Sequence, residues 1–426
     1  MGLLKRYLER QQEEGWSSVG DKYVCAKCFS DYAISDFVES HPVKCSCDYC
    51  GKISDEPLAA EMDEVLSFIA GGINREYDIP ENCLPWDGRE GGWQIVQPTD
   101  GWDLVTDGGW VNEDSDGWEK LLEDLRGSFS DNAYVQRDPL DLSHSERLAS
   151  SWGAFCHTVK HRTRFVLFKL RRTRKPKHTY YPDDMEGVPV YQILEQIGWL
   201  AQDLDLVRHL PRKKVLIRAR QHEAGVLPTT AADLGAPPSH MASQSRMSPA
   251  GISMFYAADD ERTAFLETYD PAASVKVEMS FATFETARKL RILDLTALPL
   301  VPSIFDESQY ERRHDILFFH ELARDISKPI ARDGREHYEY VPTQIVAEHF
   351  RSVFRDRRRP IDGIAFRSSR KGAGKSYCLF TGPEGCDDRF RDKQAAKFPW
   401  NKKHRFVVLR NVVRKSVVSC ISGSQS

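Results

Sequence analysis

Apolar side chains recur at two different spacings in the two halves of this chain. In the first half they repeat every three to four positions, which is the spacing of residues on one face of an α-helix. The clearest run is Leu58, Met62, Val65, Leu66 and Ile69. Further helices are predicted over residues 117–126, 144–172 and 189–208. Residues 53–208 are therefore predicted to form a mainly helical domain.

The pattern changes after Val215 to short apolar runs that are typical of β-strands. Strands are predicted over residues 275–281, 291–295, 362–366 and 377–380. Helices are predicted between them over residues 259–269, after an Asp cap, and over residues 343–355, just after Pro342. The second half is therefore expected to be an α+β domain with a substantial sheet.

Length and composition indicate a globular protein with more than one domain. The chain has 426 residues, of which 41% are hydrophobic and 29% are charged, so two or three domains are expected. No window of the sequence is apolar over the length that a membrane span requires. The first residues have neither an apolar signal core nor the composition of a transit peptide, so a cytoplasmic location is expected.

Charge leaves nucleic-acid binding as an open question. The net charge of −4 argues against attraction of the whole protein to a polyanion. The segment from Lys160 to His178 is nevertheless strongly basic, with Phe165 and Phe168 among its cations. A solvated helix face is the first interpretation of this segment, and a contact with phosphate or RNA is the alternative.

The cysteines are concentrated near the start of the chain. Two Cys-x2-Cys pairs, Cys25 with Cys28 and Cys47 with Cys50, flank residues 29–46. Two thiolate pairs at this separation can close a tetrahedral zinc site, and four sulfur ligands leave no open position, so the predicted role is structural. The alternative is a reduced loop without metal. Cys45 is a fifth thiol that leaves the membership of the second pair open.

Three segments of the second half carry distinctive motifs. They read LIRAR at 216–220, SRMSPAGISMFYAADDERTAFLETY at 245–269, and YVPTQIVAEHFR with DGIAFRSSRKGAGKSYCLF at 340–351 and 362–380. In order, spacing and character these segments resemble the RES family. The resemblance covers about residues 210–415 and implies an ADP-ribosyltransferase-like fold. The family's usual Gly-Gly-Arg-Trp-Asn is Gln-Ser-Arg-Met-Ser here.

The resemblance also implies the residues of a site that degrades NAD. The matching positions are Arg218, Arg246, Tyr256, Glu267 and Ser368. Both arginines offer planar charged forks for the pyrophosphate, although Arg220 lies on the same strand face as Arg218 and is an alternative ligand. Tyr256 would stack on nicotinamide. Glu267 would stabilise the positive ribose that forms as the glycosidic bond breaks.

Ser368 would then orient a phosphate or the attacking group. The activity implied is cleavage of the nicotinamide–ribose bond of NAD by hydrolysis or phosphorolysis, with water or phosphate as acceptor. RES proteins often act as toxins or defence effectors, so an antitoxin or other regulatory partner is expected. A homo-oligomer is expected as well.

The helical half is similar to the HEPN-related region that precedes RES in some longer proteins, on the strength of WGAFCHTVKHRTRF at 152–165. Many HEPN domains are ribonucleases with an Arg-x4-6-His pair, and two such pairs occur, Arg137 with His144 and Arg172 with His178. The rival prediction is therefore a HEPN-type ribonuclease or RNA-binding protein with an inactive RES-like half.

Taken together, these patterns predict a multidomain protein with a four-cysteine zinc module and a mainly α-helical HEPN-like domain before an α+β RES domain. The predicted domains are residues 1–52 for the N-terminal helix and zinc module, 53–208 for the helical domain, 210–415 for the RES domain and 416–426 for a flexible tail.

Overall fold

The computed structural model describes residues 11–137, 139, 141–167, 189–273, 275–330, 334–370, 372–388 and 405–423. The chain folds as two compact units, each made of two stretches. The first unit is Met1–His144 with Leu300–Asp315, and the second is Ser145–Pro299 with Ile316–Ser426. The predicted domain boundaries at residues 52–53 and 208–210 stay predictions.

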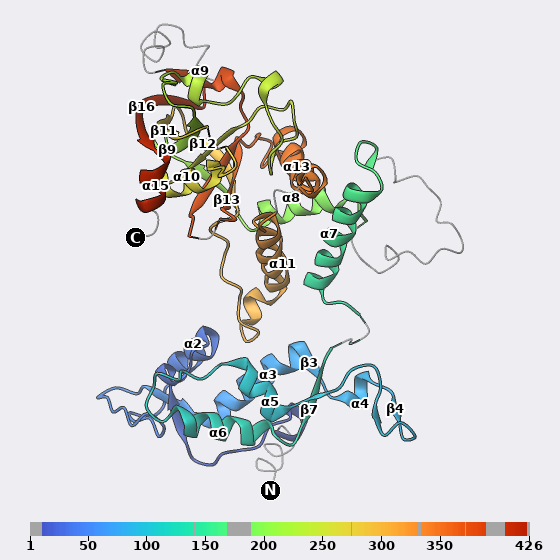
Figure 1. Ribbon diagram of the computed structural model, residues 1–426. Coiled ribbons are helices and arrows are strands. Elements are labelled where there is room, and N and C mark those ends of the chain that lie inside the picture. Colours follow the sequence, from blue (N-terminus) through green and yellow to red (C-terminus); the bar gives the residue numbers. More distant parts are fainter. Residues whose placement is uncertain are drawn as a thin grey trace. The chain divides into compact units, whose positions relative to one another are not determined.

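The first unit combines helices with short strand pairs (Figure 1). Its helices are α2 (Tyr32–Ser40), α3 (Met62–Glu76), α4 (Pro80–Cys83), α5 (Gly101–Gly108) and α6 (Trp118–Phe129). Its strands are β1 (Tyr23–Cys25) paired with β2 (Ala59–Glu61), β4 (Trp86–Asp87) with β5 (Gly92–Trp93), and β7 (Ala133–Gln136) between β3 (Tyr77–Asp78) and β6 (Thr99–Asp100). A 3-10 turn, η1 (Ala26–Cys28), follows β1.

Side-chain caps and one shared core explain this arrangement. The Asp31 carboxylate accepts hydrogen bonds from the Ala33 and Ile34 amides in the first turn of α2, and Asp100 accepts one from the Asp103 amide in the first turn of α5. Helix α5 ends at Gly109, whose φ of 60° is a left-handed conformation that glycine adopts without strain. Apolar residues of α3 and α6 pack into the same core as the cysteine-bearing turns and Phe305.

The second unit contains a nine-stranded mixed sheet in the order β15-β16-β11-β9-β10-β14-β13-β12-β8. These strands are β8 (Val207–Leu210), β9 (Val215–His222), β10 (Phe255–Ala258), β11 (Glu278–Thr286), β12 (Leu290–Asp294), β13 (Gly363–Arg367), β14 (Lys375–Leu379), β15 (Cys386–Asp388) and β16 (Val407–Ser416). The β12–β13 and β15–β16 pairs are parallel, and the other neighbours are antiparallel.

One junction in this sheet is much weaker than the rest. Strand β9 pairs with β11 along its length, and β10 pairs with β14 along its length. Between β9 and β10, however, the register holds at a single position, Ala258 opposite Ile217. The two strands therefore diverge on leaving this pair, and an opening arises inside the sheet rather than at its edge.

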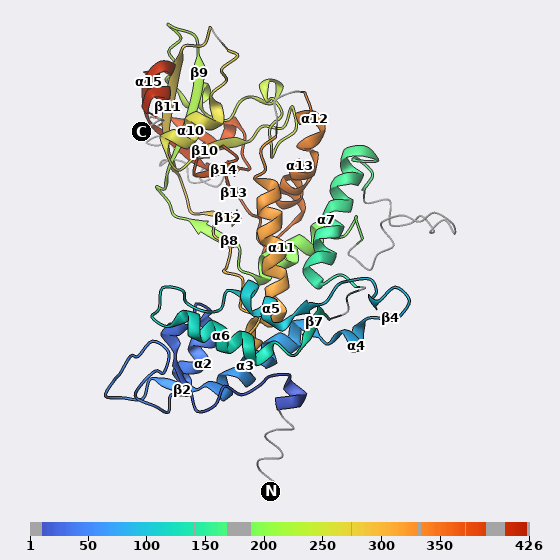
Figure 2. The same cartoon turned by 60° about the horizontal axis from the view of Figure 1, so that its bottom comes forward.

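Several helices accompany the sheet of the second unit (Figure 2). They are α7 (His144–His161), α8 (Ile193–Asp203), α9 (Ala231–Leu234), α10 (Glu261–Thr268), α11 (Tyr310–Ile326), α12 (Glu336–Glu339), α13 (Val341–Glu348) and α15 (Val417–Gly423). The first residue of α7 and the first turns of α11, up to Asp315, belong to the first unit. Helix α10 packs on β9 and β10, on either side of the weak junction. A π-helical turn, η6 (His349–Val353), extends α13.

Most of the predicted elements of the second half are present, with shifted ends. The helix predicted over 259–269 is α10, which is capped by Asp260, and the helix predicted over 343–355 begins earlier, at Val341. The long helix α11 was not expected from the sequence. Most of the basic segment 160–178 lies outside the described residues. None of the helices in the described ranges has the length and apolar character needed to cross a membrane.

Candidate functional site

A cavity of about 390 Å³ lies where β9 and β10 diverge. Residues of both strands line it, together with residues of α10, the loop at 244–246, the segments at 329–330 and 336–340, and the β13–β14 hairpin. Its charged and aromatic lining includes Arg218, Arg246, Tyr256, Glu267, Glu336 and Arg370. Four of the five residues that the RES resemblance implies therefore meet in one pocket, although they come from distant parts of the chain.

Arg218 brings an unbalanced positive charge to this pocket. Its Nη1 donates to the Tyr256 carbonyl oxygen at 3.3 Å, and its guanidinium lies 5.4 Å from the centre of the Phe255 ring. Burial lowers the pKa of Arg218. No carboxylate within the described ranges forms an ion pair with it. A partly buried guanidinium without a counter-charge favours an anionic ligand.

Arg220 does not share this setting. It is exposed, its guanidinium donates to the carbonyl oxygen of Asp233, and it is absent from the lining of the cavity. The strand alternation places both arginines on one face, but the divergence of β9 and β10 lies at the level of Arg218.

Glu267 supplies the opposing charge from α10. Asp260 caps this helix by accepting a hydrogen bond from the Thr263 amide, which fixes the direction in which the helix leaves β10. The Glu267 carboxylate accepts a hydrogen bond from Ser376 Oγ at 3.5 Å. Among the described residues it forms no ion pair, although its charge acts on Arg246 across the pocket.

The family resemblance implies that Arg246 binds pyrophosphate, but in the structure its guanidinium donates hydrogen bonds to backbone carbonyl groups. Its Nη1 donates to the Ile326 carbonyl at 2.6 Å, and its Nη2 donates to the Lys328 carbonyl at 2.7 Å. The guanidinium also stacks over the Tyr340 ring, with 5.6 Å to the centroid. Burial lowers its pKa. Arg246 therefore lines the pocket and, in the same geometry, holds the backbone that follows α11.

The Tyr256 hydroxyl belongs to a small hydroxyl cluster. It accepts a hydrogen bond from Ser245 Oγ and lies 2.9 Å from Ser248 Oγ. Burial raises the pKa of Tyr256 well above its usual value, so its hydroxyl stays protonated. Gln344 of α13 donates to the Ser245 carbonyl at 2.8 Å. The loop that carries Arg246 is thus tied down by the residues on both sides of that arginine.

Ser368 is the one implied residue that the structure does not bring to this cavity. Its amide donates to the Gly374 carbonyl at 3.0 Å, and its Oγ accepts from the Arg370 amide at 3.2 Å, as in a hairpin turn. It borders a second cavity of about 950 Å³ instead. The serines of the hairpin that line the first cavity are Ser369 and Ser376.

Sequence reasoning missed several residues of the lining. Ser376 shares a strand with Tyr377 and could have been found from its position on β14 near the hairpin. Glu336 and Tyr340 lie in and after a single-turn helix, where no periodic pattern marks them. Arg370, in the β13–β14 hairpin, is exposed and adds a further cation to the mouth of the pocket.

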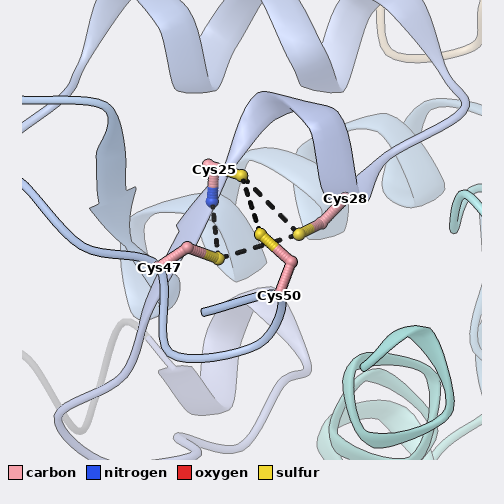
Figure 3. Close-up of side chains that lie close together, drawn as sticks. All are labelled: Cys25, Cys28, Cys47 and Cys50. Carbon is pink, nitrogen blue, oxygen red and sulfur yellow. Dashed lines mark hydrogen bonds between the residues drawn. The ribbon is translucent and has the colours of Figure 1, made fainter. Parts of the chain in front are cut away.

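The four predicted zinc ligands meet in the first unit, in a second candidate site (Figure 3). Their ligand atoms all lie within 4.8 Å of one another. The Cys25 and Cys28 sulfurs are 3.7 Å apart, Cys25 and Cys50 are 3.5 Å apart, and Cys28 and Cys47 are 3.7 Å apart. A tetrahedral centre with zinc–sulfur bonds of about 2.3 Å has sulfur–sulfur edges of about 3.8 Å. The donor set therefore fits zinc.

The surroundings of the four sulfurs agree with a closed centre. Cys25, Cys28 and Cys47 are buried and belong to the core of the first unit. The Cys25 amide donates to Cys47 Sγ at 3.4 Å. Cys45 is exposed and is not part of the cluster, which resolves the ambiguity over the second pair.

The two Arg–His pairs considered for RNA cleavage are not assembled as a site in the described part of the chain. Arg137 lies 3.5 Å from the Asp78 carboxylate and donates to the Asn74 carbonyl. His144 contacts the Asp315 carboxylate at 3.1 Å. Both side chains are thus engaged with other partners, and Arg172 and His178 lie outside the described residues.

Comparison with known proteins identifies both parts of the chain. The family model described as HEPN/RES N-terminal domain 1 matches residues 40–173, and the model described as RES domain matches residues 215–401. No curated protein matches the chain, and no solved structure matches it.

Proposed function

The chain belongs to the RES-domain family, with a HEPN/RES N-terminal domain before the RES domain, and we propose that it cleaves NAD between nicotinamide and ribose. The observation that carries the proposal is the pocket between β9 and β10, in which Arg218 and Glu267 both lack an ion-pair partner among the described residues. Charged side chains that line one cavity without pairing directly with each other are typical of a site completed by a charged ligand.

NAD carries the matching charges. Its pyrophosphate is anionic and suits the Arg218 guanidinium, with the exposed Arg370 as a second cation at the mouth. Arg246 contributes positive charge from the wall while it holds the backbone of residues 326–328. We propose that the ring of Tyr256 contacts nicotinamide, since the pocket contains this ring and its hydroxyl is occupied by serines.

The chemical step needs charge stabilisation more than proton transfer. The bond between ribose C1′ and the nicotinamide nitrogen breaks, the electron pair leaves with neutral nicotinamide, and positive charge develops on the ribose. The Glu267 carboxylate is the anion that would stabilise this charge, and Ser376 orients it through their hydrogen bond. Water or phosphate then bonds to C1′; water would release its proton to solvent.

We propose only a structural role for Ser368, in the β13–β14 hairpin. Its hydroxyl accepts from the Arg370 amide, so it would shape the turn that presents Arg370 and Ser369 to the pocket. We further propose that the sheet corresponds to the ADP-ribosyltransferase-like fold that the family resemblance implies, and that the four-cysteine cluster binds one structural zinc ion. Zinc in such a closed site would stabilise the first unit.

The biological setting follows from the chemistry. An enzyme that consumes NAD depletes a central cofactor, so a toxin or defence role in the cytoplasm, with an antitoxin or regulatory partner, is the proposed context. We also propose that the protein forms a homo-oligomer and that phosphate can serve as its co-substrate.

One experiment tests the proposed activity. Purified, zinc-replete protein is incubated with NAD, with and without inorganic phosphate, and the products are identified by mass. Nicotinamide with ADP-ribose indicates hydrolysis, whereas nicotinamide with a phosphorylated ADP-ribose indicates phosphorolysis. NAD left intact by folded protein that carries no bound inhibitor would overturn the proposal.

A further inference from the structure

One wall of the pocket has little regular structure of its own. It is formed by residues 329–330 and 336–340, between α11 and α13. The only helix in this stretch of described residues is α12, which has four residues. Because so short a helix is not stable by itself, the position of the wall depends on the elements that contact it.

Helix α7 contacts the stretch just before the wall. Trp152 is buried, with 6% of its surface exposed, and its Nε1 donates to the Asp325 carboxylate at 2.8 Å. The next residue, Ile326, accepts one of the two hydrogen bonds from Arg246 to the backbone. The hydrogen bond from α7 and the hydrogen bond from the pocket arginine therefore hold neighbouring residues. Both cartoon views show α7 beside α11 (Figures 1 and 2).

A second contact lies two turns further along the same helix. Lys160 Nζ is 2.7 Å from the Glu339 carboxylate, and the two side chains are 22% and 30% exposed. The His161 ring lies 5.8 Å from the Tyr338 ring. Glu339 immediately precedes Tyr340, the residue over which the Arg246 guanidinium stacks. Helix α7 therefore contacts both the stretch just before the wall, at Asp325, and the wall itself, at Glu339. Arg246 contacts the same two places, through the carbonyl groups of residues 326 and 328 and through the Tyr340 ring.

The boundary of the matched N-terminal family domain and the boundary between the two compact units fall on opposite sides of helix α7. The HEPN/RES N-terminal domain model extends to residue 173 and includes α7. From Ser145 onward, however, α7 is part of the same compact unit as the RES sheet. The N-terminal family domain thus supplies a structural support for the RES pocket.

We propose that α7 positions the substrate pocket, with Trp152 and Lys160 as positioning residues that hold residues 326–330 and 336–340 in place. The inference rests on the proposed NAD cleavage for its kinetic consequence only. A loosened wall would have to be ordered again when substrate binds, which weakens binding while leaving the Glu267 carboxylate untouched. The N-terminal domain would then set the substrate affinity of the enzyme.

The kinetic test uses the full-length protein with three variants and a control. Lys160→Ala removes the ion pair, and the double exchange Lys160→Glu with Glu339→Lys restores it with reversed polarity. Trp152→Phe removes the Nε1 donor and keeps an aromatic ring, although a smaller one. Lys160→Ala and Trp152→Phe should raise KM for NAD by roughly three- to tenfold with a smaller change in kcat, since partly exposed pairs contribute modestly. The double exchange should return KM towards the original value.

Arg357→Ala is the matched control, because it removes an exposed ion pair with Asp205 in the same unit and lines neither cavity. It should leave KM and kcat unchanged. Equal effects of Arg357→Ala and Lys160→Ala would overturn the inference, because they would show that any lost ion pair has the same consequence.

Amide hydrogen exchange gives a readout that does not require activity. Without NAD, residues 326–330 and 336–340 should exchange faster in Lys160→Ala than in the original protein, and the double exchange should reverse the change. Unchanged exchange, or faster exchange with an unchanged KM, would overturn the inference. If exchange responds as expected but the original protein leaves NAD intact, the positioning by α7 stands and the proposed activity fails.

Discussion

The cysteine cluster and the RES pocket are both buried sites, but they balance their polar groups in opposite ways. In the cluster, four sulfurs from two nearby turns face one another, and a single divalent cation would satisfy all of them. In the pocket, Arg218 and Glu267 come from segments far apart in sequence and line one cavity, each without an ion-pair partner in the described residues. Four converging donors suit a structural ion, whereas charged side chains that line a cavity without pairing directly suit a ligand that carries charge.

The largest effect is expected on the free energy of unfolding, when one cysteine of the four-cysteine cluster is replaced. Cys25→Ser removes one of four ligands, and structural zinc contributes roughly 10–16 kcal/mol in small zinc-binding domains. The free energy of unfolding of the first unit should fall by at least about 4 kcal/mol, with loss of bound zinc. Thermal unfolding together with elemental analysis measures both quantities.

Cys45→Ser provides the matched control for that experiment, because Cys45 is exposed and lies outside the cluster. Its unfolding free energy should change by no more than about 0.5 kcal/mol. If Cys25→Ser and Cys45→Ser unfolded alike and both retained full stability after chelation, the closed-site interpretation would be wrong.

The next largest effect should come from neutralising the anion of the pocket. Glu267→Gln keeps the shape of the side chain and removes the charge that would meet the developing positive ribose, so kcat should fall by about 100- to 1,000-fold with little change in KM. Glu261→Gln, on the same helix but paired with Lys415 and outside the cavity, should leave kcat intact. Full turnover by Glu267→Gln would contradict the proposed mechanism.

A third test concerns His349, a buried histidine that lies outside both sites and whose ring nitrogens form no hydrogen bonds within the described residues. It is 6% exposed, and burial lowers its pKa to about 4. Its pKa in the unfolded chain is about 6.5. The folded state therefore binds fewer protons than the unfolded state between these two values.

Protonation of His349 should therefore leave the free energy of unfolding unaffected above pH 6.5. As the pH falls from 6.5 towards 4, it should lower this free energy by on the order of 3 kcal/mol. Chemical unfolding of the second unit across this range measures the slope. His349→Phe keeps an apolar ring beside Phe350 and Phe354 and should flatten the pH dependence. An unchanged slope in this variant would assign the pH dependence to other groups.

The smallest effect is expected on NAD affinity, in a test that compares two arginines of strand β9. Arg218→Ala removes the uncompensated cation, and loss of one charge-assisted contact costs about 1.5–3 kcal/mol, or roughly ten- to over a hundredfold in NAD affinity. The loss should diminish at high salt. Arg220→Ala removes a side chain that donates to the Asp233 carbonyl and should change affinity little. Binding measured by calorimetry at two salt concentrations distinguishes them; the reverse order would move the anion site to Arg220.

The two sites also differ in how far the sequence alone predicts them. The four cysteines of the cluster are close in sequence within each pair, so spacing was enough to predict that they meet, and only the place of Cys45 needed the structure. Arg218, Arg246, Tyr256 and Glu267 were expected to lie together from a family resemblance, and the structure places all four around one cavity. Their catalytic and binding roles stay predictions.

What the sequence did not reveal depends on contacts with the backbone or on irregular segments. The acceptors of Arg246 are carbonyl groups, which every residue has, so no sequence pattern marks them. Ser368 and Ser376 are both near the β13–β14 hairpin, and the turn geometry alone decides which of them faces Glu267. Helix α11 buries the adjacent pair Phe318 and Phe319 among many charged residues, which obscures its helical period.

The single residue pair between β9 and β10 has a consequence for the order of folding. Strands β9, β11 and β16 form one hydrogen-bonded ladder, and β10, β14, β13 and β12 form another. Within the described residues, Ala258 opposite Ile217 is the one register pair between them. Each ladder can form before the two join. Because Arg218 lies on one ladder and Ser376 on the other, their side chains line one pocket only after the two ladders have docked, so the site forms late in the folding of the second unit.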